Sequence, residues 1–372
     1  MKLMKLIVAL ACCSSVFGAR RYEFNVAPGA DVVIAFQARG IEGTWRLGTA
    51  PVVAVRSGDG LAQVVLIHSP RWFFYSIFLP QTNGAVVMTS EAEFEIKDFS
   101  REPAREEVLR YAPILVSRNE PGILQNDLPL LVYCEISRNP RRLAYTCIFS
   151  NEDGGTDTQA LFARWGRSTD IELVYTIEWS AAGTRRETIQ TYEHKIVPFT
   201  GKKEGDHPVI HVATTNNVFD SSGGGAYRFQ IPPRSYETFE RTRESVMDEQ
   251  PWTYRIMREE LEREQKFFDP TRYVYVDFRG TVREAAIGAG LKFKSGEEVF
   301  SYGEKPKNRV NRSGWIRIGI PLPAGKTASD VESLFFDCDK AGGCSVQAIA
   351  QAMMLDADDQ PVKLPMAYSF RF

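Results

Sequence analysis

Short apolar runs that end at turn residues are the dominant feature of this sequence. Between residues 19 and 100 the runs are rich in Val, Ile, Phe and Tyr, and Pro-Gly, Asp-Gly and Asn-Gly pairs separate them. Runs of this length with such breaks are typical of antiparallel strands. They predict a β-sandwich with strands at 31–37, 51–56, 61–68, 72–79, 85–89 and 93–98.

The same pattern continues in two further regions. Its clearest strand covers 170–179. The odd-numbered residues from Ile171 to Trp179 are all apolar or aromatic and share one face, while Asp170 and Glu172 lie on the other face. This period of two is typical of a half-buried strand. Strands are predicted near 130–137, 143–150, 159–165, 170–179, 187–194 and 208–215, and again from about 271 to 372.

One segment has the features of a helix. Pro251 suits a first helical turn, and residues 252–266 are good helix formers with Trp252, Ile256 and Leu261 as a packing stripe. Arg and Glu alternate along this segment, which indicates a solvated, ion-paired face. The run Ser221–Gly225 predicts a flexible loop or linker.

The predicted fold class is mainly β, with two to three antiparallel β-sandwich domains and one amphipathic helix. A length of 372 residues is enough for two to three domains with hydrophobic cores. The expected parts are a signal peptide at 1–18, an N-terminal sandwich at 19–100, a middle β-rich domain at 105–235, a helical connector at 236–268 and a C-terminal sandwich at 269–372.

Composition excludes several classes of protein. A hydrophobic fraction of 44% with 25% charged residues is that of a folded globular chain and not of a disordered one. The 45 basic and 47 acidic residues nearly cancel, so no overall field would recruit nucleic acid. No stretch after residue 18 reaches the roughly 18 apolar residues of a spanning helix, so no transmembrane helix is expected in the mature chain.

The N-terminus predicts export. Lys2 and Lys5 form a basic start, residues 6–13 are apolar, and Val16–Gly18 provides the residues that a signal peptidase recognises. Cleavage after Gly18 would deliver a periplasmic or secreted protein. A lipoprotein attached through Cys12 or Cys13 is the alternative. An outer-membrane association is a further one, because the alternating aromatics of Tyr368–Phe372 are similar to the last strand of outer-membrane barrels.

Four cysteines remain after residue 18, and an even number in an oxidising compartment predicts two disulfides. A loop centred on Pro140 and Arg141 would place Cys134 opposite Cys147 across a hairpin. Two buried thiols are the alternative for this pair. Between Cys338 and Cys344, Gly342 and Gly343 permit a tight loop closed by a structural disulfide.

Common catalytic signatures are missing from the sequence, including His-Glu-x-x-His, Gly-x-Ser-x-Gly and the Walker loop. The four histidines are His68, His194, His207 and His211. Four residues of strand would separate His207 from His211 by about 13 Å, so the two do not readily share one ion. A structural role is the simpler interpretation of His207 and His211. The alternative interpretation is a functional polar site formed by His194, His207 and His211.

The strongest candidate for a metal centre is acidic. Asp157 belongs to the carboxylate-rich turn of residues 151–157, and Asp170 and Glu172 share one face of a later strand, about 6.6 Å apart along it. Three such carboxylates would suit a hard cation such as calcium or magnesium. The alternative is a Gly-Gly turn beside a solvated strand face.

A resemblance to known families rests on three segments within 105–225: Gly166–Glu172, Tyr192–His194 and His207–Val212. In order and spacing they resemble the core of the secreted necrosis-inducing protein family and of a vacuolar-sorting-associated family of plants and fungi. The resemblance implies a β-sandwich that holds a divalent cation partly through Asp170 and Glu172 and acts at membrane glycolipids. Arg167, Thr169 and Ile171 stand where the first family has His, His and Trp. The stretch also resembles uncharacterised secreted bacterial proteins.

Two functions are consistent with these observations. The first is an exported, non-enzymatic binding protein that presents loops at a sandwich end to a glycan, a lipid headgroup or an envelope protein. The alternative is a divalent-metal-dependent membrane-active effector or hydrolase of the middle domain. It would use Asp157, Asp170 and Glu172, with His194 as general base.

Overall fold

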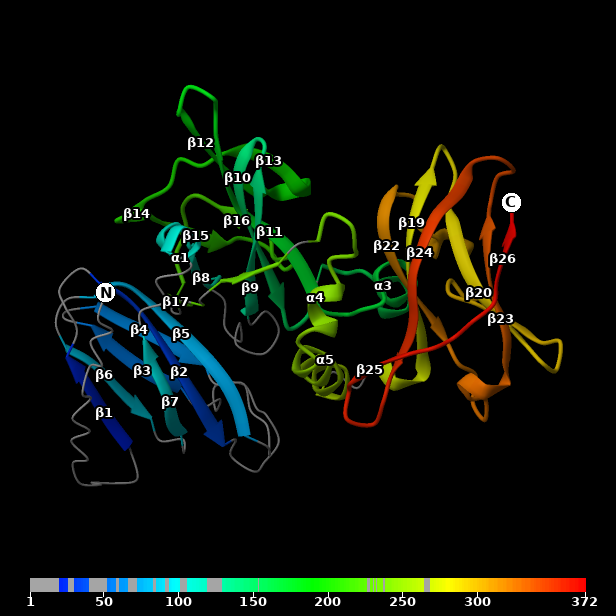
Figure 1. The fold of residues 1–372 in the computed structure, drawn as a ribbon, viewed down its shortest axis with the longest axis horizontal. Helices are drawn as coiled ribbons and strands as arrows, with labels where there is room; N and C mark the ends of the chain where they lie inside the picture. The colour runs from blue at the N-terminus through cyan, green and yellow to red at the C-terminus, as the bar shows by residue number, and fades with distance from the viewer. Residues whose placement is uncertain are drawn as a thin grey trace, which may run out of the picture. The chain divides into compact units, whose positions relative to one another are not determined.

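The computed structural model describes most of the chain after residue 19. The described residues are 20–25, 30–39, 52–57, 60–65, 72–82, 85–90, 94–100, 106–118, 129–152, 154–225, 228–229, 231, 233–236, 238–263 and 268–372. The predicted signal peptide with Cys12 and Cys13 lies outside these residues, and so does His68. The structure confirms a mainly β fold with several sheets and few helices (Figure 1).

The chain divides into two compact units. The first consists of residues 1–147 and 172–235, and the second of 148–171 and 236–372. Each unit is therefore built from two separate stretches of chain. The division falls within two strands, β10 (Arg141–Phe149) and β11 (Asp170–Trp179).

The N-terminal strands of the first unit form two antiparallel sheets, as the short runs predict (blue to cyan in Figure 1). One sheet has the order β1-β6-β3-β4 and the other β5-β2-β7. The strands are β1 (Arg20–Asn25), β2 (Ala30–Arg39), β3 (Val52–Ser57), β4 (Gly60–Val65), β5 (Trp72–Thr82), β6 (Ala85–Ser90) and β7 (Phe94–Ser100).

The remainder of the first unit holds two further sheets. A six-stranded sheet has the order β13-β12-β11-β10-β9-β18, and a five-stranded one joins β14-β15-β8-β17 with β16 paired to β15. The new elements are α1 (Glu106–Arg110), β8 (Ile114–Val116), β9 (Pro129–Arg138), β12 (Arg185–Thr191), η2 (Tyr192–His194), β13 (Lys195–Pro198), β14 (Lys203–Glu204), β15 (His207–Val212), β16 (Phe219–Asp220), β17 (Arg228–Phe229) and β18 (Arg234–Ser235).

The predicted hairpin disulfide is not formed: Cys134 and Cys147 are buried thiols. The turn between β9 and β10 is Asn139–Pro140, two residues wide, and not Pro140–Arg141. Pairing across this turn moves the partner of Cys134 by two residues, from Cys147 to Tyr145. In agreement, Ala144 and Tyr145 interact with the Cys134 thiol, whose pKa is raised by burial. The alternative of two buried thiols is therefore the correct one.

The strand predicted over 159–165 is wrong, because a helix, α3 (Thr158–Trp165), occupies this place in the second unit. Its N-cap is Asp157, whose Oδ1 accepts a hydrogen bond of 2.9 Å from the Gln159 backbone N–H. Gly166 closes the helix in the left-handed conformation at φ 62° and donates its N–H to the Phe162 carbonyl. These two caps satisfy backbone groups that a strand would present to neighbouring strands.

Two sheets form the C-terminal part of the second unit, where a third antiparallel sandwich is predicted (yellow to red in Figure 1); one pair, β23 with β26, is parallel. One sheet has the order β22-β19-β24-β25 and the other β21-β20-β23-β26. The strands are β19 (Tyr273–Val282), β20 (Ile287–Phe293), β21 (Glu298–Phe300), β22 (Gly314–Pro321), β23 (Val331–Cys338), β24 (Cys344–Leu355), β25 (Pro361–Lys363) and β26 (Tyr368–Arg371). Alternate residues of both sheets, such as Phe278, Ile318 and Phe336, form a shared buried core.

Short helices complete the second unit. The predicted helix is present as α5 (Trp252–Arg263), with Ile256 and Leu261 buried as its packing stripe requires. It follows α4 (Ser245–Asp248), and single turns η3 (Pro270–Arg272), η4 (Pro306–Asn308) and η5 (Ala328–Asp330) connect strands. The structure therefore contains more than the one helix that was predicted.

The face of β19 and β22 opposite the core carries a buried charge network. Arg317, fully buried, donates at 2.6 Å from Nε to Asp277 Oδ1 and at 2.6 Å from Nη2 to Asp248 Oδ2. Gln351 donates to the same two carboxylates, at 2.8 and 2.9 Å. Burial raises the pKa of Asp277, whereas the Arg317 charge holds the pKa of Asp248 low against burial. The network connects α4 to the sheet.

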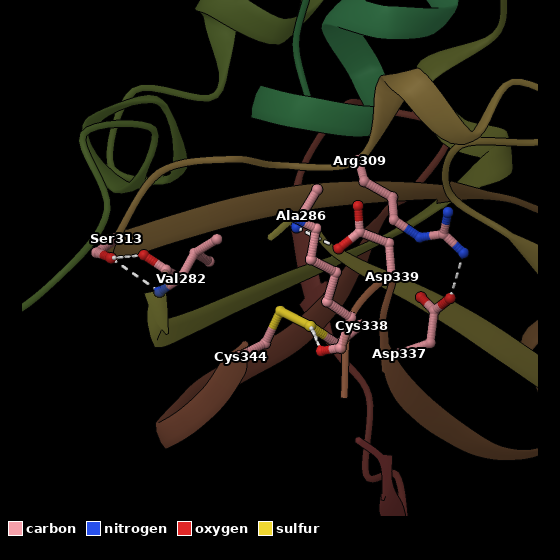
Figure 2. Close-up of a disulfide and its surroundings, with 9 residues drawn as sticks. Val282, Ala286, Arg309, Ser313, Asp337, Cys338, Asp339 and Cys344 are labelled. Atoms are coloured by element: carbon pink, nitrogen blue, oxygen red, sulfur yellow. Dashed lines mark hydrogen bonds and ion pairs between the residues drawn. A yellow bond between two sulfur atoms is a disulfide. The ribbon is translucent and has the colours of Figure 1, made fainter. Parts of the chain in front are cut away.

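The second predicted disulfide is confirmed between Cys338, which ends β23, and Cys344, which begins β24 (Figure 2). It closes the corner where the chain passes from one sheet of the sandwich to the other. Beside it, Asp339 accepts a 2.7 Å hydrogen bond from the Ala286 N–H, and Arg309 pairs with Asp337 at 2.6 Å.

Replacing both Cys338 and Cys344 by Ser should lower the free energy of unfolding by about 2 kcal/mol. The two cysteines are 6 positions apart in the sequence, and a disulfide that closes so short a loop removes only a modest entropy from the unfolded chain. Urea unfolding of the wild type with and without a reductant measures the effect. The reductant should destabilise the wild type and leave the double variant unchanged, and equal sensitivity of both would contradict the prediction.

Candidate functional site

The structure distributes the three predicted metal ligands among different contacts. Asp157 caps α3, and its Oδ2 lies 2.6 Å from Lys305 Nζ. The hydrogen bond from Lys305 lowers the pKa of the Asp157 carboxyl. The carboxylate is thus held as a surface ion pair on the second unit.

Asp170 is buried in the second unit beside Arg167. The Arg167 Nη1 lies 3.9 Å from Asp170 Oδ1, and its Nε donates at 3.1 Å to Glu244. Burial opposes the charge of Arg167, but Glu244 and Asp170 outweigh it and raise the pKa of the guanidinium. A permanent positive charge therefore stands where the resembled family has a histidine. Such a charge neutralises Asp170 and competes with a cation for it.

Glu172 and His194 are the two predicted site residues that come together. Glu172 is buried on β11, and its Oε2 lies 3.5 Å from Nδ1 of His194 in η2. Gln190 of β12 connects them, because its Nε2 donates to Glu172 Oε2 and lies 3.2 Å from His194 Nδ1. The β11–β12 register, with Tyr175 opposite Ile189, produces this proximity. We call Glu172, Gln190, Tyr192 and His194 the His194 cluster.

The backbone of the His194 cluster is strained. Glu193 and His194 have φ values of 56° and 55°, in the left-handed region that residues other than Gly rarely adopt. Such conformations each cost of order 1–3 kcal/mol and are retained where the surrounding structure holds them, often at ligand sites. This one-turn bend ends the strand that was predicted over 187–194 at Thr191. It also leaves Tyr192 exposed, at 67% of its surface.

The chemistry of the His194 cluster combines fixed polar groups with an aromatic face. One Gln190 N–H is directed to the Glu172 carboxylate, and the other is within reach of His194 Nδ1. If Gln190 donates to Nδ1, the imidazole carries its proton on Nε2. If the imidazole is protonated, the Glu172 carboxylate, with Oε2 3.5 Å from Nδ1, is an acceptor for the Nδ1 proton. In either protonation state, Gln190 or Glu172 contacts Nδ1 and so orients the His194 ring from its buried side.

The other two histidines have structural positions in β15. His207 is buried, and its Nδ1 lies 3.0 Å from the Ala112 carbonyl, so this nitrogen is the donor. His211 lies half-buried in the same strand, between β8 and β16. Among the described residues, no group of three or more His, Cys, Asp or Glu side chains is arranged to hold a metal ion.

Gln190 and Tyr192 were not predicted as site residues. The Tyr-Glu-His sequence at 192–194 is part of the resemblance described above, but no residue pattern indicates that two non-glycine residues there adopt positive φ.

In the part of the chain that the structure describes, no helix has the length and apolar character needed to cross a bilayer.

Comparisons with known proteins add no assignment to these observations. No protein-family model matches the chain, and no curated protein sequence matches it.

Proposed function

We propose that the chain is an exported binding protein that recognises a carbohydrate through the His194 cluster. The observation that carries this proposal is the strained turn that displays Tyr192 and His194 while Glu172 and Gln190 fix the imidazole from behind. Binding sites combine an aromatic surface with a few polar groups held in place before the ligand arrives. A sugar ring offers the matching apolar face and hydroxyl groups.

Export is part of the proposal. The basic and apolar leader at 1–18 supports it, and the Cys338–Cys344 disulfide suits an oxidising compartment. A lipid headgroup and an envelope protein are the other partner classes consistent with the sequence, and they are outcomes of the test below.

Tyr192→Ala and His194→Ala should each weaken carbohydrate binding at least about tenfold, equivalent to about 1.4 kcal/mol. A glycan array identifies the oligosaccharide, and titration calorimetry measures its affinity for the wild type and both variants. Tyr368→Ala is the matched control, because Tyr368 is an exposed tyrosine of the second unit. Equal affinities in all four proteins, or the absence of any bound glycan, would sink the proposal. Liposomes and envelope extracts would then be the next ligands.

A divalent-metal-dependent effector or hydrolase is the second candidate, because Glu172 Oε2 and His194 Nδ1 lie 3.5 Å apart. A cation at 100 times its dissociation constant should add about 2.7 kcal/mol to stability. Thermal unfolding in chelator and then with Ca²⁺, Mg²⁺, Mn²⁺ or Zn²⁺ tests this. A shift lost in Glu172→Gln but retained in Asp170→Asn would favour the metal function at the His194 cluster. A shift lost in Asp170→Asn would restore the acidic site that the sequence predicts.

A further inference from the structure

A group of guanidinium side chains surrounds Trp165 in the second unit. Trp165 is the last residue of α3, and the Arg164 and Arg312 guanidinium carbons lie 5.9 and 5.2 Å from its ring centroid. Arg164 belongs to the helix, whereas Arg312 lies in the loop before β22. All three side chains are half-buried. We call Arg164, Trp165 and Arg312 the Trp165 cluster.

Backbone carbonyls hold the two arginines in place. Arg312 Nη2 donates at 2.7 Å to the Arg164 carbonyl, and Arg164 Nη2 donates at 2.7 Å to the Lys307 carbonyl. Neither bond neutralises a charge, because a carbonyl is uncharged. Arg164 Nε has no hydrogen-bond partner at all. Each guanidinium carries five N–H donors, so most of this capacity is unused by the protein.

No carboxylate balances these charges. Within the described residues, none lies within ion-pair distance of Arg164, Arg312 or the nearby Arg243. Glu244 acts on Arg312 through space but is already bonded to Arg167. Burial lowers the pKa of Arg312 to about 10. Glu244 raises this pKa, but the positive charges of three nearby arginines lower it further: Arg167, Arg243 and Arg164. The Glu244 carboxylate that acts on Arg312 is thus shared with Arg167.

We propose that the Trp165 cluster binds an oxyanion: a carboxylate, sulfate or phosphate group of a larger ligand. Planar guanidinium groups bind such anions through paired N–H donors, and two of them converge here on one half-exposed indole. A bound anion would supply the negative charge that balances the Arg164 and Arg312 guanidinium groups. Trp165 would contact the apolar part of the ligand next to its acidic group. This site lies within the second unit and does not depend on the proposed function of the His194 cluster.

Titration calorimetry at constant ionic strength tests the site with three probes: inorganic phosphate, sulfate and trigalacturonic acid. Constant ionic strength matters because sulfate and phosphate also stabilise proteins without binding to a site. We expect at least one probe to bind the wild type and to lose at least about tenfold in affinity in Arg312→Gln and in Arg164→Gln. Arg279→Gln is the matched control, since Arg279 is an exposed arginine of the same unit that pairs with Glu240.

The outcomes separate the ligand sources. Preference for phosphate indicates a phosphorylated ligand or a phospholipid headgroup, whereas preference for trigalacturonic acid indicates an acidic glycan. Absence of binding for all three probes in the wild type overturns the proposal, and so does equal affinity in wild type, Arg164→Gln and Arg279→Gln. Arg164→Gln keeps the test decisive if Arg312→Gln does not fold, because Arg164 projects from a helix end. Glycan binding by the His194 cluster would be unchanged in either result.

Discussion

Arg317→Leu is expected to lower the free energy of unfolding of the second unit by about 3–5 kcal/mol. The substitution removes the guanidinium group that donates to both Asp248 and Asp277 in the network described above. It leaves the buried Asp277 carboxylate without this cationic partner. A buried ion that loses its partner retains the desolvation cost without the compensating attraction. Arg317 Nη1 also donates a 2.5 Å hydrogen bond to the Tyr254 hydroxyl oxygen, so this oxygen loses a donor as well. Urea unfolding measures the change.

Arg371→Leu is the matched control for this prediction. Arg371 makes two hydrogen bonds to Glu298, of 2.7 and 2.8 Å, but lies on the surface, where ion pairs contribute about 0–1 kcal/mol. Adding Asp248→Asn and Asp277→Asn to Arg317→Leu should recover part of the lost stability, because no buried charge then remains. A cost for Arg317→Leu as small as that of Arg371→Leu would show that the buried network is energetically unimportant.

The pH dependence of Arg317→Leu provides a second check on the same cause. Burial already raises the pKa of Asp277, and removal of Arg317 should raise it further. A carboxyl whose folded pKa exceeds its unfolded value binds more protons in the folded state, so its cost grows as pH rises and shrinks as pH falls. The deficit of Arg317→Leu relative to wild type should therefore be smaller at about pH 5 than at about pH 7.

The fold class was predictable because alternation and turn residues are local signals. The β-strands of residues 20–100 and those after residue 273 both follow from these signals. The errors arise where local signals compete. The apolar residues of 159–165 fit a strand or a helix, and the deciding caps, Asp157 and Gly166, are single residues at either end. Similarly, the position of one turn beside Pro140 changes the partner of Cys134 by two residues.

The candidate sites were predictable only in part, because they depend on contacts distant in sequence. Glu172 and His194 were both named as site residues, but their proximity depends on the β11–β12 register, which the sequence does not determine. The Trp165 cluster was not predicted at all. Arg164 and Arg312 are 148 residues apart, and no local pattern connects a helix end to a loop at that separation.

Gly225→Ala is expected to destabilise the first unit by about 3 kcal/mol, whereas Gly224→Ala should be neutral or stabilising by up to about 1 kcal/mol. The sequence of 221–225 predicts a flexible loop or linker, but a Cβ on Gly225 would lie 1.8 Å from the Ser117 carbonyl oxygen. Ser117 follows β8 directly, so backbone must shift to relieve this contact. A Cβ on Gly224 meets nothing within 4 Å.

The neighbouring position makes this comparison specific. Both variants add the same methyl group and restrict the unfolded chain equally, so a difference between them reports only the close approach of Gly225 to Ser117. Urea unfolding gives the two free energies, and hydrogen exchange of the β8 amides shows where the Gly225→Ala variant is loosened. Equal stabilities would mean that the glycine run is an ordinary flexible connection. A selective loss in Gly225→Ala would instead establish it as a packed segment of the first unit, with glycine required by the space available.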